Sequence, residues 1–221
     1  MRWPWERLAA LGGIVAVALW IIGTAILEAA DGPDEDDPAD ILRWYQDESN
    51  TILAGGFIFE LGALCFLVLL AALLSRLWWA EGGTGFLSIV ALAGGLGTAL
   101  FAMGIPAADM AGALSEDDLS PQAAQALSVL DNVFFIVAEL SAALLVAAVG
   151  FLILRVRPLP SWLGWISLVL ALWLLIPPIG WAGLIFGIPL WTLIVSVLLY
   201  LPKPIPPPGP PPHTAGFVGT E

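Results

Sequence analysis

Two glutamates, Glu60 and Glu139, lie inside long apolar stretches of this 221-residue chain and are the residues best suited to do chemistry. No Lys or Arg stands within either stretch to neutralise them. An isolated carboxylate inside a bilayer costs about 2–3 kcal/mol or more on insertion scales, so each acid is expected to hold a proton. Such a pair has the chemistry of a proton-carrying or cation-binding site. The alternative is structural, because a protonated Glu also donates a hydrogen bond to a neighbouring helix.

The two acids occupy matching places in an internal repeat. A shift of 79 residues brings Glu60-Leu61 onto Glu139-Leu140 and Arg76 onto Arg155. Each acid therefore precedes an arginine by 16 residues, which is about 24 Å along a helix. A weaker echo relates the segments before them, Gly23-Thr24-Ala25 and Gly97-Thr98-Ala99, each followed within 12 residues by Ala-Ala-Asp. The repeated unit would be a helical hairpin, with the two copies parallel. Chance similarity between Leu- and Ala-rich helices is the alternative.

Thr98 and Met103 could line a path beside the acids, since both lie in the apolar stretch between them. Thr98 also belongs to a set of small residues spaced four apart, together with Ala91, Gly94 and Gly95. Small faces of this kind let helix backbones approach closely. Packing is therefore the competing interpretation for Thr98.

Most other chemistry is excluded by composition. Cys65 is the only cysteine and His213 the only histidine, and His213 lies in a proline-rich tail. Zinc sites, histidine-ligated haem and copper or iron centres therefore lack their usual ligands. No HExxH motif occurs, and no Ser/His pair can form within the apolar stretches. We predict no catalytic residue, no metal, no cofactor and no enzymatic activity.

The elements that must hold the acids are membrane helices. The chain is 59% hydrophobic and 12% charged, with a mean hydropathy of +0.92, whereas soluble domains carry about a quarter charged residues. The sequence predicts an all-α polytopic membrane helix bundle over 1–201, with a parallel repeat of a two-helix hairpin. Its six expected helices cover about 8–27, 52–75, 86–106, 132–154, 162–176 and 181–201. The last two, separated by Pro177-Pro178, would form a tight hairpin, and a re-entrant pair with both ends on one side is the alternative.

Charge predicts the orientation of this bundle. Six of the seven cations follow or precede helices on one side, which the positive-inside rule makes cytoplasmic. The loops expected on the other side, 28–51 and 107–131, hold 14 of the 19 acids. Tryptophans gather at the basic side, as in an interfacial belt. We expect a multi-pass protein of the plasma membrane with both termini in the cytoplasm.

Each acidic loop contains a helix start. Asp37-Pro38 and Ser120-Pro121 both place an N-cap residue before a proline at the first helical position. The first of these helices has apolar residues at helical spacing, so it is expected to lie partly on the outer surface. It would then turn inward at Gly55-Gly56.

Partners follow from charge and from the tail. The net charge of −12 argues against nucleic acid, which leaves the lipid bilayer and either a second copy or another membrane protein. Residues 202–221 are proline-rich and are predicted to be a disordered cytoplasmic tail. A run of this kind could also dock on a protein that binds proline-rich motifs.

The chain resembles an uncharacterised family of multi-pass integral membrane proteins of high-GC bacteria. The resemblance is carried by Asp40-Ile41-Leu42 to Leu53-Ala54-Gly55-Gly56, by Ser75-Arg76-Leu77 and by Glu81-Gly82-Gly83-Thr84-Gly85, and it extends over roughly 5–200. It implies a class and no activity. From the residues, we expect a small transporter or proton-linked permeation protein that uses the glutamate pair. The alternative is a non-catalytic membrane scaffold or an accessory subunit of a larger complex.

Overall fold

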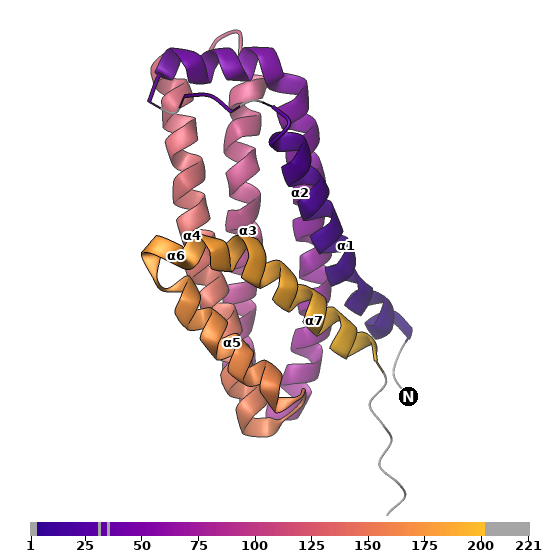
Figure 1. The fold of residues 1–221 in the computed structure, drawn as a ribbon. Coiled ribbons are helices and arrows are strands. Elements are labelled where there is room, and N and C mark those ends of the chain that lie inside the picture. The colour runs from indigo at the N-terminus through magenta and orange to yellow at the C-terminus, as the bar shows by residue number, and fades with distance from the viewer. Residues whose placement is uncertain (1–3, 31, 35, 202–221) are drawn as a thin grey trace, which may run out of the picture.

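The chain folds as a bundle of long helices. The computed structural model describes residues 4–30, 32–34 and 36–201, and these ranges contain helices and loops but no strand. Four long helices run alternately up and down the bundle, and a broken helical hairpin follows them (Figure 1). The elements are α1 (Pro4–Leu27), α2 (Pro38–Glu81), α3 (Phe86–Leu114), α4 (Pro121–Val156), α5 (Ser161–Leu174), α6 (Pro177–Ala182), the π-helical turn η1 (Gly183–Gly187) and α7 (Ile188–Tyr200). The predicted all-α membrane helix bundle is confirmed, and the tail expected at 202–221 lies outside the described residues.

The fold belongs in a membrane. Five helical stretches are long and apolar enough to cross a bilayer, and large apolar side chains cover the outside of the bundle. Leu100, Phe151 and Val169 are each more than half exposed. Water would meet these side chains at a large cost, whereas lipid tails solvate them.

Both predicted helix starts are confirmed. Asp37 accepts a hydrogen bond from the backbone N–H of Ala39 at 2.9 Å, and Ser120 accepts one from Ala123 at 3.3 Å. A proline follows each cap at the first position of the helix, where a backbone N–H is not needed. These caps lie outside the expected spans, so α2 and α4 extend well beyond 52–75 and 132–154.

The first 11 residues of α2 form a separate surface segment, which we call the cap helix (38–48). At about 1.5 Å per residue, the 44 residues of α2 would reach about 66 Å as one straight rod. The helix instead bends at Glu48, whose φ of −113° and ψ of 15° are not helical, and the cap helix lies across the ends of α3 and α4 (Figure 1). The bend expected at Gly55-Gly56 was wrong, because these two glycines lie in the continuous part of α2. They are packing sites there, Gly55 against Leu27 and Gly56 against Met110.

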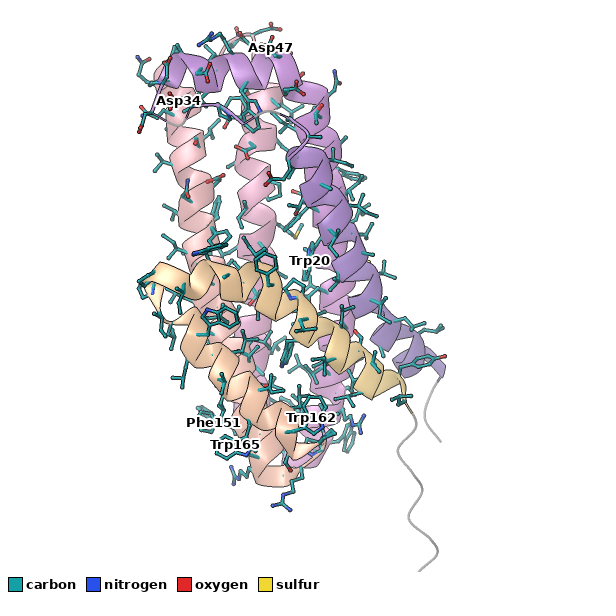
Figure 2. The ribbon with its side chains drawn as sticks, in the orientation of Figure 1. Trp20, Asp34, Asp47, Phe151, Trp162 and Trp165 are labelled. Atoms are coloured by element: carbon teal, nitrogen blue, oxygen red, sulfur yellow. The ribbon has the colours of Figure 1, made fainter. Side chains whose placement is uncertain are left out.

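The two ends of the bundle differ in charge. Asp34 and Asp47 lie at the end covered by the cap helix, and Trp162 and Trp165 lie at the other (Figure 2). We call these the acidic end and the basic end, since α2 and α4 finish at the latter near Arg76, Arg155 and Arg157.

At the basic end a glutamate closes the turn between α2 and α3. The turn uses three glycines with positive φ, Gly82, Gly83 and Gly85, and Gly85 has no side chain with which to cap α3. Glu81 takes this role, because its carboxylate accepts two backbone N–H groups and one hydroxyl from the first turn of α3. An acid at this helix terminus also interacts favourably with the helix dipole.

Equivalent contacts support the predicted repeat. The echoing segments relate α1 to α3 by a shift of 74 residues, and the glutamates relate α2 to α4 by a shift of 79. In the first hairpin, a Cβ on Gly62 would lie 2.7 Å from Trp20 Cδ1. In the second, a Cβ on Gly94 would lie 2.9 Å from the Ser141 carbonyl oxygen. Gly94 and Ser141 are the residues to which the two shifts carry Trp20 and Gly62, so both hairpins cross at the same place.

A second pair of contacts follows the same rule one to two turns nearer the acidic end. A Cβ on Gly55 would lie 2.8 Å from Leu27 Cγ in the first hairpin. Their equivalents in the second hairpin, Phe134 and Phe101, stack with ring centroids 6.2 Å apart. The small and large residues differ between the copies, but the register is the same. The fold therefore contains two parallel helical hairpins, α1–α2 and α3–α4.

The segment 161–200 is a re-entrant hairpin, so the expected six crossings are corrected to four helices that run the length of the bundle and one hairpin. The 14 residues of α5 span about 21 Å, which is shorter than a hydrocarbon core of about 30 Å. At the tip, Gly180 lies against Glu139 of α4. From there α7 returns obliquely, and Ser196 near its end lies against Gly13 of α1, towards the basic end (Figure 1). Both ends of the hairpin therefore lie towards the basic end, the alternative that the sequence had left open.

Candidate functional site

Glu139 is the most buried acid side chain among the described residues, with 8% of its surface exposed. It follows the fully buried Ala138 on α4, and its carboxyl group lies against the Cα of Gly180 in α6. Only a glycine fits there, because a Cβ would overlap Oε1 of Glu139. No hydrogen bond or ion pair reaches Glu139 from any residue that the structure describes. The acid is thus buried without a cation, as the sequence predicted.

The hairpin tip beside Glu139 contains an unpaired backbone carbonyl. The carbonyl of Leu174, the last residue of α5, would normally accept a bond from the N–H three or four residues later. Those residues are Pro177 and Pro178, which have no N–H. No donor reaches the Leu174 oxygen within the described part of the chain. This oxygen lies 2.8 Å from the point where a Cβ of Gly180 would stand, beside the Glu139 carboxyl.

The donors at the tip are already in use. The N–H groups of Ile179 and Gly180 both bond to the carbonyl of Ile176, at 3.0 and 2.8 Å. The indole N–H of Trp173 bonds to the carbonyl of Ile179 at 2.9 Å and ties the two arms of the hairpin together. An ionised Glu139 therefore has no donor at the tip, and it would face the negative end of the α5 dipole. A neutral carboxylic acid suits this position, because it brings its own donor.

Glu60 holds the equivalent position in the first hairpin but has different surroundings. It lies one turn beyond Gly56, which packs against Pro106 and Met110 of α3, and it is half-buried. No hydrogen bond or charge interaction joins Glu60 to Glu139 among the described residues. The structure does not bring the two carboxyls together as one pair, and the re-entrant hairpin covers only one of them.

The two residues suggested as path lining behave differently. Thr98 is buried, and its hydroxyl donates a hydrogen bond of 2.8 Å to the carbonyl of Gly94 in its own helix. This bond and its small neighbours fit the packing interpretation. Met103 is half-buried on α3, and its path-lining role stays a prediction.

A tyrosine–aspartate pair at the acidic end was missed by the sequence reasoning. Tyr45 of the cap helix is fully buried, and its hydroxyl donates to the Asp109 carboxylate of α3 at 3.0 Å. Burial, and then the nearby Asp109 and Asp131 charges, raise the pKa of the Tyr45 phenol, so it remains a donor at any physiological pH. The sequence assigned 107–131 to an external loop, whereas α3 continues to Leu114. The Ala-Ala-Asp echo that ends at Asp109 was the available signal.

No group of three or more His, Cys, Asp and Glu side chains suited to a metal ion occurs within the ranges that the structure describes. The arrangement at Glu139 can therefore be read from its own groups: one acid, one unpaired carbonyl and a glycine that lets them meet. Comparison of the chain with family models, with curated proteins and with solved structures gives no match. The resemblance to a family of multi-pass proteins stays a prediction, and the function must be argued from this geometry.

Proposed function

We propose that the chain is a small proton-linked transport or permeation protein in which Glu139 and Glu60 carry protons. One observation carries the proposal: Glu139 is buried, without a cation, against the tip of a helical hairpin that is broken inside the bundle. Acids within membrane helices mark ion and proton paths, and broken helices in transporters place their free ends at the binding site. A bundle needed only for packing has no use for this combination.

The physics of the site supports a cycle of proton binding and release. In the closed hairpin Glu139 is stable only in its neutral form, because no donor and no cation is within reach. Losing the proton requires water or a cation at the tip, and therefore a different arrangement of α5 and α6. Proton release at this acid is in this way linked to a conformational change, which is what proton-coupled transport requires.

The same charge pattern supports an orientation. We place the basic end and both termini in the cytoplasm, and the cap helix outside a plasma membrane, because arginines concentrate at the ends of α2 and α4. Protons from outside would then enter past the acidic end.

Reconstitution into proteoliposomes tests the function. An imposed pH gradient should collapse faster with the wild-type protein than in empty vesicles, as followed by an enclosed pH-sensitive dye. Glu139→Gln should abolish this flux and Glu60→Gln should reduce or abolish it, while both proteins keep their thermal stability. Asp47→Asn, which removes an exposed acid of the cap helix, is the matched control and should leave the flux unchanged.

The scaffold alternative predicts the opposite pattern. In that case the wild-type vesicles would leak no faster than empty ones, and Glu139→Gln would lower the melting temperature instead. This result would refute the transport proposal.

A further inference from the structure

We propose that the proton on Glu139 is shared with the Leu174 carbonyl, so that this acid latches the re-entrant hairpin closed when protonated and releases it when ionised. The inference rests on the proposed function in assuming that Glu139 exchanges its proton, and it assigns the group that receives the hydrogen bond. The site is a proton-binding site made by one side chain of α4 and one backbone oxygen of α5.

The Pro177-Pro178 pair creates the acceptor. A helix that ends in water can leave its last carbonyls to solvent, but the tip of this hairpin lies inside the bundle against α4. Any residue other than proline at 177 or 178 could have supplied the Leu174 oxygen with a backbone donor. An unsatisfied carbonyl in lipid surroundings costs several kcal/mol, so the fold has to supply a donor from elsewhere.

Glu139 is the side chain in the right place to be that donor. Its Oε1 and the Leu174 oxygen approach the same face of Gly180, where any larger residue would separate them. The carboxyl has no other partner, and the nearest N–H groups of the tip are bonded to Ile176. A neutral acid and an unpaired carbonyl satisfy one another, whereas a carboxylate and a carbonyl repel.

No other titratable group at the tip competes for this role. The elements α5, α6 and η1 carry no acidic or basic residue, and α3 carries only Asp109. On α4 itself the other charged residues are Asp131 and Arg155, both two turns or more from Glu139 along the helix. The remaining helix that packs on α4 is α2, whose titratable residues are Asp40, Arg43, Tyr45, Asp47, Glu48, Glu60, Cys65, Arg76 and Glu81. Of these, only Glu60 and Cys65 lie in the interior of the span.

The hairpin is built to move when the latch opens. Beyond Gly180 the chain forms the π-helical turn η1, which begins and ends in glycine. Such turns are uncommon and interrupt the regular hydrogen bonding of a helix. Ionisation of Glu139 would place a negative charge beside the C-terminal end of α5, and the short, glycine-rich α6–η1 segment would yield first.

Infrared difference spectroscopy in lipid tests the shared proton. The carboxylic C=O band that disappears in Glu139→Gln should lie at the low wavenumber of a hydrogen-bonded acid. Pro178→Ala returns a backbone N–H to compete for the Leu174 oxygen, so the band should move to higher wavenumber. Pro189→Ala returns an N–H elsewhere in the same hairpin and should leave the band in place. A Glu139 band that is identical in all three backgrounds would overturn the proposal.

Hydrogen exchange gives an independent test that needs no proline variant. Glu139→Gln keeps a donor at this position, whereas Glu139→Met keeps the length but not the donor. At one pH, the amides of 179–187 should exchange slowly in the Gln variant and roughly tenfold faster in the Met variant, the change expected for loss of one hydrogen bond. Equal exchange in the two variants would refute the latch.

The two proposals can fail separately. A band shift with Pro178→Ala in a protein that carries no proton flux would leave the latch and remove the transport function. Flux that depends on Glu139 without any band shift would do the reverse.

Discussion

Replacement of Gly180 by Ala tests the close approach on which the site depends. A Cβ at this position would lie 2.8 Å from the Leu174 oxygen and would overlap the Glu139 carboxyl. The glutamate can move its flexible end, but the Leu174 oxygen belongs to the backbone and cannot give way without moving the end of α5. We therefore expect the hairpin tip to be pushed away from α4.

The magnitude follows from two opposing effects. Gly→Ala inside a helix ordinarily gains about 1 kcal/mol, whereas forcing a methyl group into a packed site costs about 1–3 kcal/mol. Gly183→Ala is the matched control, because its Cβ would meet only the Leu174 side chain, at 3.0 and 3.3 Å, and this side chain can shift. Gly180→Ala should therefore be less stable than Gly183→Ala by about 2 kcal/mol.

Reversible unfolding in mixed detergent micelles would measure this difference. If the Leu174 oxygen is the obstacle, combining Gly180→Ala with Glu139→Met should restore little of the lost stability. If the carboxyl is the obstacle, the double variant should recover most of it. Equal unfolding free energies for Gly180→Ala and Gly183→Ala would refute the tight tip, and with it the reasoning that brings Glu139 and Leu174 together.

Two further predictions concern the acidic end. Tyr45→Phe should lower the unfolding free energy by about 1–3 kcal/mol, because it leaves Asp109 without its donor, while Tyr200→Phe at the exposed second tyrosine should cost little; equal losses would contradict the buried pair. On a background lacking the native cysteine, Asp47→Cys in intact cells should react with an impermeant maleimide and Thr84→Cys should not, and the reverse pattern would overturn the proposed orientation.

Hydropathy and local capping predicted the bundle because they depend on properties of single segments. The apolar stretches lie inside the observed helices, and the caps Asp37 and Ser120 begin α2 and α4 as expected. The bend in α2 could not be placed in the same way. Gly55-Gly56 looked like the flexible point, but tertiary contacts with α1 and α3 occupy both glycines, and the helix bends instead at Glu48, near the acidic surface.

The site was only half visible in the sequence. A glutamate in an apolar helix stands out by type alone, so Glu139 was found at once. Its neighbours Leu174 and Gly180 are ordinary apolar residues more than 30 positions away, and only the folded hairpin brings them to it. The Pro177-Pro178 pair indicated a break, but the carbonyl that it leaves unpaired gains meaning only when an acid lies beside it.

The C-terminal hairpin makes the two repeated acids unequal. Glu60 and Glu139 hold the same register in two parallel hairpins, so duplication alone would give them the same surroundings. The tip formed by α5 and α6 packs on α4, which buries Glu139 and leaves Glu60 half-buried on α2. A half-buried acid can exchange its proton with water at less cost than one enclosed by a hairpin. In a proton path Glu60 would therefore exchange readily and Glu139 would gate, so the two glutamine variants report on different steps and their effects on flux need not be equal.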